Sequence, residues 1–387
     1  MVRPTMAVLL KPIVSLAIAA LLLGACTMAR PGPTPTPIPI SSPTPSPTPA
    51  DSKAANLRIQ VDLLLGEHVM VVAKQAVAAS NHTDDYTGYL TLLTTNANSL
   101  AEIIRSGFGN GPAAQVEQAW TIQNGYLVDY TIGLATHNDD KSNGAMSGLT
   151  NGFVPQFTQV ITSLIQLPAA QVTQLVTQQV TQMKAVIDEE VAQSYPKMYS
   201  DIRAAYADRL RLGDGLAIRM AQQFPDKFPG DPSSKAVDAR VSLNYLLQEH
   251  SYLATMTTNA AASQRSSEQN GAAAALGANA DALGKFFTEM LGAGAGTQIA
   301  QLWGARNSDL IAYATSGDAA ARQGLTDKFV TGFYALAPVP VGVETAREQV
   351  NATIKVVDDQ RAKAFKQVAG DDRAAASAMR AIADRIV

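Results

Sequence analysis

The apolar positions after residue 55 recur with the period of an α-helix. In 57–72 they fall at every third or fourth position and form one stripe that also holds a histidine, and 116–130 and 172–187 carry similar stripes. This spacing places side chains on one helical face. Glycine, proline and asparagine residues at 107–112, 138–144 and 167–168 separate the stripes. The pattern predicts helices and no alternating strands.

The same segments recur later in the chain. "LLGEH" (64–68) returns as "LLQEH" (246–250), and the two tryptophans, Trp120 and Trp303, coincide when 119–131 is placed on 302–314. Further segments match in the same order: 92–104 with 275–287, 178–189 with 348–359, and 201–205 with 371–375. Ordered matching of this kind indicates an internal duplication. We therefore expect an all-α fold with two tandem homologous bundles of about six helices each.

Composition places the boundaries between these predicted parts. Three prolines and a glycine fall within 222–238, which predicts a linker at 226–235 between a first bundle (55–225) and a second (236–387). Nine of the 20 prolines fall within 31–50. Because proline removes backbone donors and fixes φ, this stretch predicts a disordered, polyproline-like stalk over 26–54. Residues 1–25 remain as a leader.

The leader has the features of a signal peptide. Arg3 and Lys11 precede an apolar run over 12–23, which is too short to span a membrane stably. The next residues, Leu23-Gly24-Ala25-Cys26, resemble the bacterial lipoprotein signal. This resemblance implies cleavage before Cys26, acylation of its thiol, export, and anchoring by membrane lipid on the extracytoplasmic face of the cell envelope. The alternative is an ordinary secretory peptide that is cut nearby and leaves a free thiol.

Charge and cysteine content narrow the possible partners. Cys26 is the only cysteine, so no intrachain disulfide can form, and the lipid reading explains its presence in an exported chain. Beyond position 50 the chain has 27 basic and 33 acidic residues, and no basic block stands out. Nucleic acid is therefore not an expected partner.

Polar side chains interrupt the apolar stripes at matching places in both repeats. His68 and His250 lie on the predicted first helices, and they are accompanied by Asn96, Gln123 and Gln179 in the first repeat and by Asn279, Arg306 and Gln349 in the second. Buried polar groups need internal partners, so each bundle is expected to contain a polar cluster. Three interpretations remain open: a hydrogen-bonded core histidine that fixes helix register, a remnant or weak metal site, or a misassigned helix face.

These residues resemble a motif set found in exported bacterial proteins with tandem helical modules. That family, mostly uncharacterised, carries Glu-His on the first helix, an asparagine on the second, and histidines on the third, fifth and sixth, which implies a metal site. By position, the later histidines are replaced here by Gln123 or Arg306, by Gln179 or Gln349, and by about Asp208 or Ala378. One imidazole with amides is a poor transition-metal site, so we predict no cofactor; a transition metal or haem is the alternative.

No serine or cysteine has a plausible base beside it, so an enzyme is not expected. Glu67 and His68 are adjacent on a helix and diverge by about 100°, so they should not line one pocket. The predicted function is a membrane-anchored envelope lipoprotein with a non-enzymatic binding or structural role toward an unknown protein or small molecule. The alternatives are a metal- or haem-binding, possibly redox-active protein, and capture of a small ligand between bundle helices.

Overall fold

The first long helix, α1 (Lys53–Ser80), is buried on nearly every side. It begins at Ser52, whose Oγ accepts a hydrogen bond from the backbone N of Ala55. Helix α8 (Lys235–Ala262) begins in the same way at Ser234 and is buried to a similar extent. Both are core helices, although they also bury polar side chains such as Asp62 and Lys74 on α1 and Asn244 on α8. Among the described residues, α1 is long and apolar enough to cross a membrane, but other helices enclose most of its surface.

The computed structural model describes residues 49–336 and 342–387. The predicted signal peptide, Cys26 and nearly all of the predicted stalk lie outside these residues. A short 3₁₀ turn, η1 (Pro49–Asp51), precedes α1. The first repeat continues with α2 (Tyr86–Phe108), α3 (Asn110–Ala135), α4 (Asp139–Ser147), η2 (Gly148–Phe153), α5 (Val154–Leu164), α6 (Ala169–Val191) and α7 (Tyr195–Gln223). The second has α8, α9 (Ser266–Leu291), α10 (Ala293–Ser316), α11 (Ala319–Gln323), η3 (Gly324–Phe329), α12 (Val330–Leu336), α13 (Val343–Ala362) and α14 (Phe365–Ile386).

The all-α prediction is confirmed, and no strand occurs in the part of the chain that the structure describes. In each repeat the fourth helical rod contains a π-helical segment, η2 or η3, between two α-helical pieces. Gly109 and Gly292, with φ of 87° and 91°, separate the second and third helices of their repeats. The positive φ explains glycine at these turns, because L side chains rarely adopt it.

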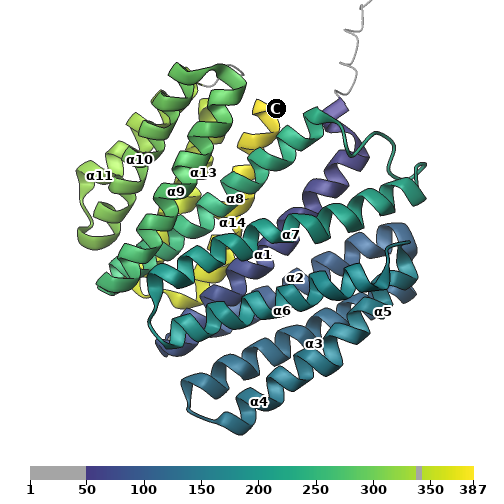
Figure 1. Ribbon diagram of the computed structural model, residues 1–387. Coiled ribbons are helices and arrows are strands. Elements are labelled where there is room, and N and C mark those ends of the chain that lie inside the picture. Colours follow the sequence, from purple (N-terminus) through teal and green to yellow (C-terminus); the bar gives the residue numbers. More distant parts are fainter. Residues whose placement is uncertain (1–48, 337–341) are drawn as a thin grey trace, which may run out of the picture. The chain divides into compact units, whose positions relative to one another are not determined.

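The two repeats pack through their first, second and last helices. Helix α1 contacts α2, α3, α6 and α7, whereas α8 contacts α9, α10, α13 and α14. Helix α1 also packs on α8, and the last helix of each repeat packs on the second helix of the other, α7 on α9 and α14 on α2 (Figure 1). Most buried apolar side chains of both repeats form one continuous core, and Ala55, Ile59, Val237 and Val241 form a small separate cluster.

Equivalent positions make equivalent contacts in the two repeats. The Tyr130 hydroxyl donates to Asp188 on α6, and the Tyr313 hydroxyl donates to Asp358 on α13, both at 2.5 Å. Arg58 on α1 pairs with Asp214 on α7, and in the same way Arg240 on α8 pairs with Asp384 on α14. These pairs join the first helix of a repeat to its last.

Candidate functional site

The histidine of the first repeat is enclosed in the core. His68 on α1 is fully buried, and its Nε2 donates to Oδ1 of Asn124 on α3 at 2.8 Å. The imidazole also packs on Trp120, with ring centroids 4.8 Å apart. Burial, followed by the charge of Arg209, lowers the pKa of His68 to about 3. The imidazole is therefore neutral at physiological pH.

The predicted companions of His68 are buried, with one correction. Gln123 and Gln179 have 0 % and 1 % of their surface exposed, and their side-chain amides find no hydrogen-bond partner among the described residues. Asp208 does not join them: it accepts from Gln178 and Gln182 on the α6–α7 face. Its neighbour Arg209 is the buried residue, because one position along a helix rotates a side chain by about 100°. Burial lowers the pKa of Arg209 to about 10.

The second-helix asparagines have different bonds in the two repeats. The amide nitrogen of Asn96 donates to Leu64 O and Glu67 Oε2, and its Oδ1 accepts from the Trp120 indole at 3.3 Å. Asn279 makes the same two amide bonds, to Leu246 O and Glu249 Oε2. Its Oδ1 instead accepts from Nδ1 of His250 at 2.8 Å. Only the second repeat therefore joins this asparagine directly to the histidine.

His250 is held between an asparagine and an arginine. With Nδ1 donating to Asn279, its Nε2 accepts from Nη1 of Arg306 at 3.1 Å. Arg306 also donates to Gln349 and Thr353 on α13, and its guanidinium lies over the Trp303 and Phe329 rings. Burial and the Arg306 charge lower the pKa of His250 to about 3, and burial lowers that of Arg306 to about 9.

In each repeat the charge of one buried guanidinium acts on the histidine, but from a different helix. In the first repeat the arginine is Arg209 on α7, and the α3 position is Gln123. In the second it is Arg306 on α10, and the α14 position equivalent to Arg209 is Met379, which is fully buried. The sequence signal for Arg209 was its place on the α7 stripe with Ile202 and Leu216.

These clusters do not fit a cationic cofactor. The lone pair of His250 that could coordinate a metal is used by Arg306, and its other nitrogen is bonded to Asn279. In the first repeat the Arg209 charge acts on His68, which would repel a metal ion. In residues 49–336 and 342–387, no group of three or more histidine, cysteine, aspartate or glutamate side chains is arranged to hold a metal.

The glutamates next to the histidines join the two repeats. Glu67 on α1 accepts from Nε of Arg373 on α14 at 3.0 Å, and Glu249 on α8 accepts from Nε of Arg203 on α7 at 2.9 Å. Both glutamate residues are 4 % exposed. The expectation that Glu67 and His68 face different ways is consistent with this geometry. Sequence reasoning missed the partners because they lie about 300 and 50 residues away.

A further, fully buried ion pair connects the repeats two helical turns beyond Glu67 on α1. Lys74 lies 2.8 Å from Asp372 on α14 and donates to Thr255 on α8. The Tyr89 hydroxyl donates to the same Asp372 carboxylate at 2.7 Å. A buried charge is stable only when it is paired and hydrogen-bonded, and here both conditions are met.

A cleft is lined by residues of α1, α2 and α14, with Gln248 of α8. Its volume is about 430 Å³, within the range of small-molecule sites. Leu63, Leu64, Ile103 and Ala376 give it apolar walls. Its polar lining is Gln60, Glu67, Ser99, Glu102, Gln248, Arg373, Ser377 and Arg380. The cleft therefore combines apolar surface with partly exposed guanidinium groups, which neither histidine cluster does.

Comparison with known proteins assigns neither a family nor a function to this chain. No protein-family model, curated protein or solved structure matches this chain. Its function is therefore inferred from its own residues.

Proposed function

We propose that this chain is a membrane-anchored lipoprotein of the cell envelope, with a non-enzymatic binding role in its helical body. The Leu23-Gly24-Ala25-Cys26 motif, the apolar run before it and the lone cysteine support the anchor. Two acyl chains give stable membrane attachment, at about 0.8 kcal/mol per buried methylene. The proline-rich segment after Cys26 would hold the body away from the lipid surface.

The cleft beside α14 is the observation that carries the binding role. The two imidazoles were the leading ligand candidates. Both are fully buried, and burial together with the charge of an arginine lowers the pKa of each. The cleft has room for a small molecule and offers both polar and apolar contacts. A concave surface with a few convergent polar groups is the usual form of a ligand site.

Metabolic labelling with a palmitate analogue, followed by membrane fractionation, tests the anchor. The unsubstituted protein should be labelled and found with membranes, and a Cys26→Ser variant should be unlabelled and soluble. Thr27→Ala, at the neighbouring position, is the matched control and should behave like the unsubstituted protein. Membrane retention of unlabelled Cys26→Ser protein would reject the lipoprotein proposal.

A further inference from the structure

The cleft between α1, α2 and α14 contains guanidinium groups with unused donors. Arg373 donates through Nε to Glu67 and through Nη2 to Ser99, and Arg380 donates through Nε to Asp384 and through Nη2 to Asn56. Their side chains are 27 % and 29 % exposed. Because a guanidinium has five N–H donors, each arginine has donors left for a ligand. A planar guanidinium suits a carboxylate, which it can bind in a bidentate manner.

Positive charge continues along the same surface. A neighbouring hollow of about 320 Å³ shares Gln60 and Ile103 with the cleft and is also lined by Lys53 and Lys227. The acidic groups of the cleft already have partners: Glu67 is buried against Arg373, and Glu102 pairs with Arg105. Arg373 and Arg380 are likewise paired, with Glu67 and Asp384, so the excess positive charge that favours an anion comes from Lys53 and Lys227.

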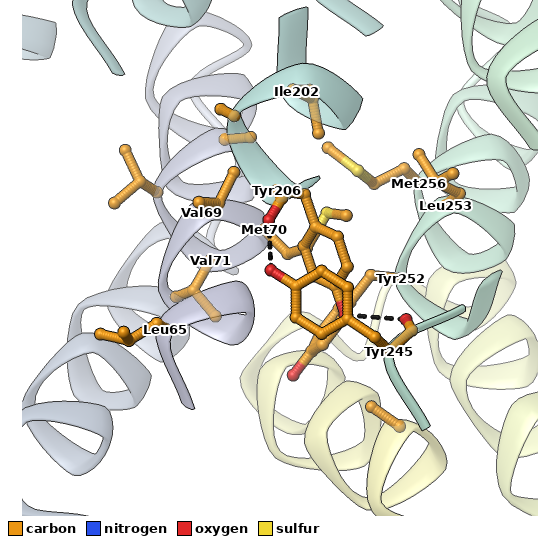
Figure 2. Close-up of a cluster of buried hydrophobic side chains, with 14 of the residues drawn as sticks. Leu65, Val69, Met70, Val71, Ile202, Tyr206, Tyr245, Tyr252, Leu253 and Met256 are labelled. Atoms are coloured by element: carbon orange, nitrogen blue, oxygen red, sulfur yellow. Dashed lines mark hydrogen bonds between the residues drawn. The ribbon is translucent and has the colours of Figure 1, made fainter. Parts of the chain in front are cut away.

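The place that the repeat makes equivalent to the cleft is filled by aromatic rings. Tyr206 on α7 and Tyr245 on α8 pack with ring centroids 4.0 Å apart, and Figure 2 shows the two rings against each other beside Met70. The Tyr206 hydroxyl is within donor distance of Gln248 Oε1 (2.8 Å) and of the backbone O of Tyr245 (3.0 Å), and the Tyr245 hydroxyl donates to the backbone O of Tyr206. Gly66 permits this packing, because a Cβ there would lie 2.6 Å from the Tyr206 ring.

The residues at the corresponding positions of the cleft differ in a consistent way. When the two repeats are aligned, Ala376 occupies the position of Tyr206, Leu63 that of Tyr245, and Gln248 that of Gly66. Arg380 stands for Leu210. The cleft side has therefore exchanged two rings for small or aliphatic side chains, and a leucine for an arginine. Lost packing volume coincides with a gained cation, which is the chemistry of a binding site, whereas the Gln248 oxygen already accepts from Tyr206.

We propose that the α1–α2–α14 cleft binds an amphipathic organic carboxylate. The carboxylate binds the free N–H groups of Arg380 and Arg373, and the apolar body lies against Leu63, Ile103 and Ala376. The hollow that leads to Lys53 accommodates a longer or doubly charged ligand. This inference deepens the proposed binding role and rests on it.

Calorimetric titration of purified Cys26→Ser protein with decanoate, below its micelle concentration, tests the ligand class. Decyltrimethylammonium, with the same chain length and the opposite charge, is the comparison probe. Decanoate should bind at least about tenfold more tightly than the cation, because a guanidinium site favours anions. No decanoate binding, or equal affinity for both probes, overturns the proposal.

Two variants locate the site. Arg380→Leu introduces the leucine found at the aligned position, Leu210, and should weaken decanoate binding by about tenfold or more. Ala376→Tyr should fill the cleft and abolish binding, with circular dichroism confirming the fold. Arg211→Leu, an exposed arginine of α7, is the control and should leave affinity unchanged. Unchanged affinity in a folded Arg380→Leu protein overturns the assignment even if Ala376→Tyr fails to fold.

The two proposals can fail separately. If palmitate labelling succeeds and decanoate does not bind, the ligand class is wrong and the lipid anchor stands. If decanoate binds but labelling fails, the anchor is wrong and the cleft assignment stands.

Discussion

The Nη1 of Arg306 donates to Nε2 of His250 across 3.1 Å, inside a core that excludes both side chains from solvent. The salt bridges of the described residues include none to Arg306. The Arg306 guanidinium thus has a neutral imidazole and two side-chain oxygens as partners, in place of the usual carboxylate. In the first repeat the charge of the buried Arg209 acts on His68 from another helix, so each neutral histidine lies in the field of one buried arginine.

Moving the arginine of the second repeat from position 306 on α10 to position 379 on α14 tests whether the two positions share one cluster. Arg306→Gln alone removes the donor to His250 and should cost about 2–4 kcal/mol, and Met379→Arg alone adds a second buried cation and should cost about 3 kcal/mol or more. The double variant recreates the Gln123–Arg209 arrangement and should cost less than the sum by at least about 1.5 kcal/mol. Urea unfolding of all four proteins measures the coupling. Additive costs would show that the two positions do not share one cluster.

The buried histidines should make stability depend on acid. The pKa of His68 is lowered from its usual value of 6.5 to about 3, so the unfolded chain binds a proton that the folded chain does not. The contribution of neutral His68 to the free energy of unfolding is complete above pH 6.5. It falls by about 1.4 kcal/mol per pH unit as pH drops from 6.5 toward 3. Between pH 7 and 4.5, the stability advantage over a His68→Gln variant should shrink by about 2–3 kcal/mol.

Urea unfolding of both proteins at the two pH values measures that difference. Burial raises the pKa of Glu190 to about 8, so its contribution is greatest below pH 4.5 and is lost as pH rises toward 8. Because Glu190 is present in both proteins, its effect cancels in the comparison. An advantage that does not change with pH would mean that His68 titrates alike in both states.

The pairing of Glu67 with Arg373 should matter more than a surface pair. Arg373→Leu leaves the buried Glu67 carboxylate with Asn96 and Tyr252 as donors but without a cation, and should cost about 2–4 kcal/mol. Arg105→Leu, which breaks the exposed pair with Glu102, should cost less than about 0.5 kcal/mol. Thermal and chemical unfolding compare the two. Equal costs would contradict a structural role for the pair between repeats.

Two glycines within helices should respond in opposite ways to alanine. Gly66→Ala places a methyl group 2.6 Å from the Tyr206 ring and should destabilise the protein by about 1–3 kcal/mol. Gly277, within α9, has no atom within 4 Å of an added Cβ, so Gly277→Ala should stabilise by about 0.5–1 kcal/mol. Melting temperatures provide the measurement. A stable Gly66→Ala protein would mean that the Tyr206–Tyr245 pair can move aside.

Periodicity predicted the helices because a buried helical face repeats every three or four residues whatever it packs against. It placed His68, Gln123, Gln179 and His250 in the core correctly. It did not place Arg209, because the sixth-helix position was taken from family resemblance, and a shift of one residue moves a side chain to another face. The turn at Gly109 lies in the glycine-rich segment 107–112, which the sequence predicted as a break between helices.

Contacts between repeats were beyond sequence reasoning. The spacing of Glu67 and Arg373 says nothing about α14 packing on α2, since that packing depends on the whole surface of both helices. The cleft was also missed, because it depends on volume lost at Ala376 relative to Tyr206. Comparing the repeats position by position at the last helix would have given the signal: a tyrosine in one and an alanine in the other.

The most direct measurement is an NMR titration of the His68 and His250 imidazoles, with and without zinc. If they are closed structural groups, both should stay neutral down to about pH 4, and zinc should shift neither resonance. Titration of either ring near pH 6.5, or a stoichiometric zinc-induced shift that His68→Ala abolishes, would contradict that role and restore the metal site.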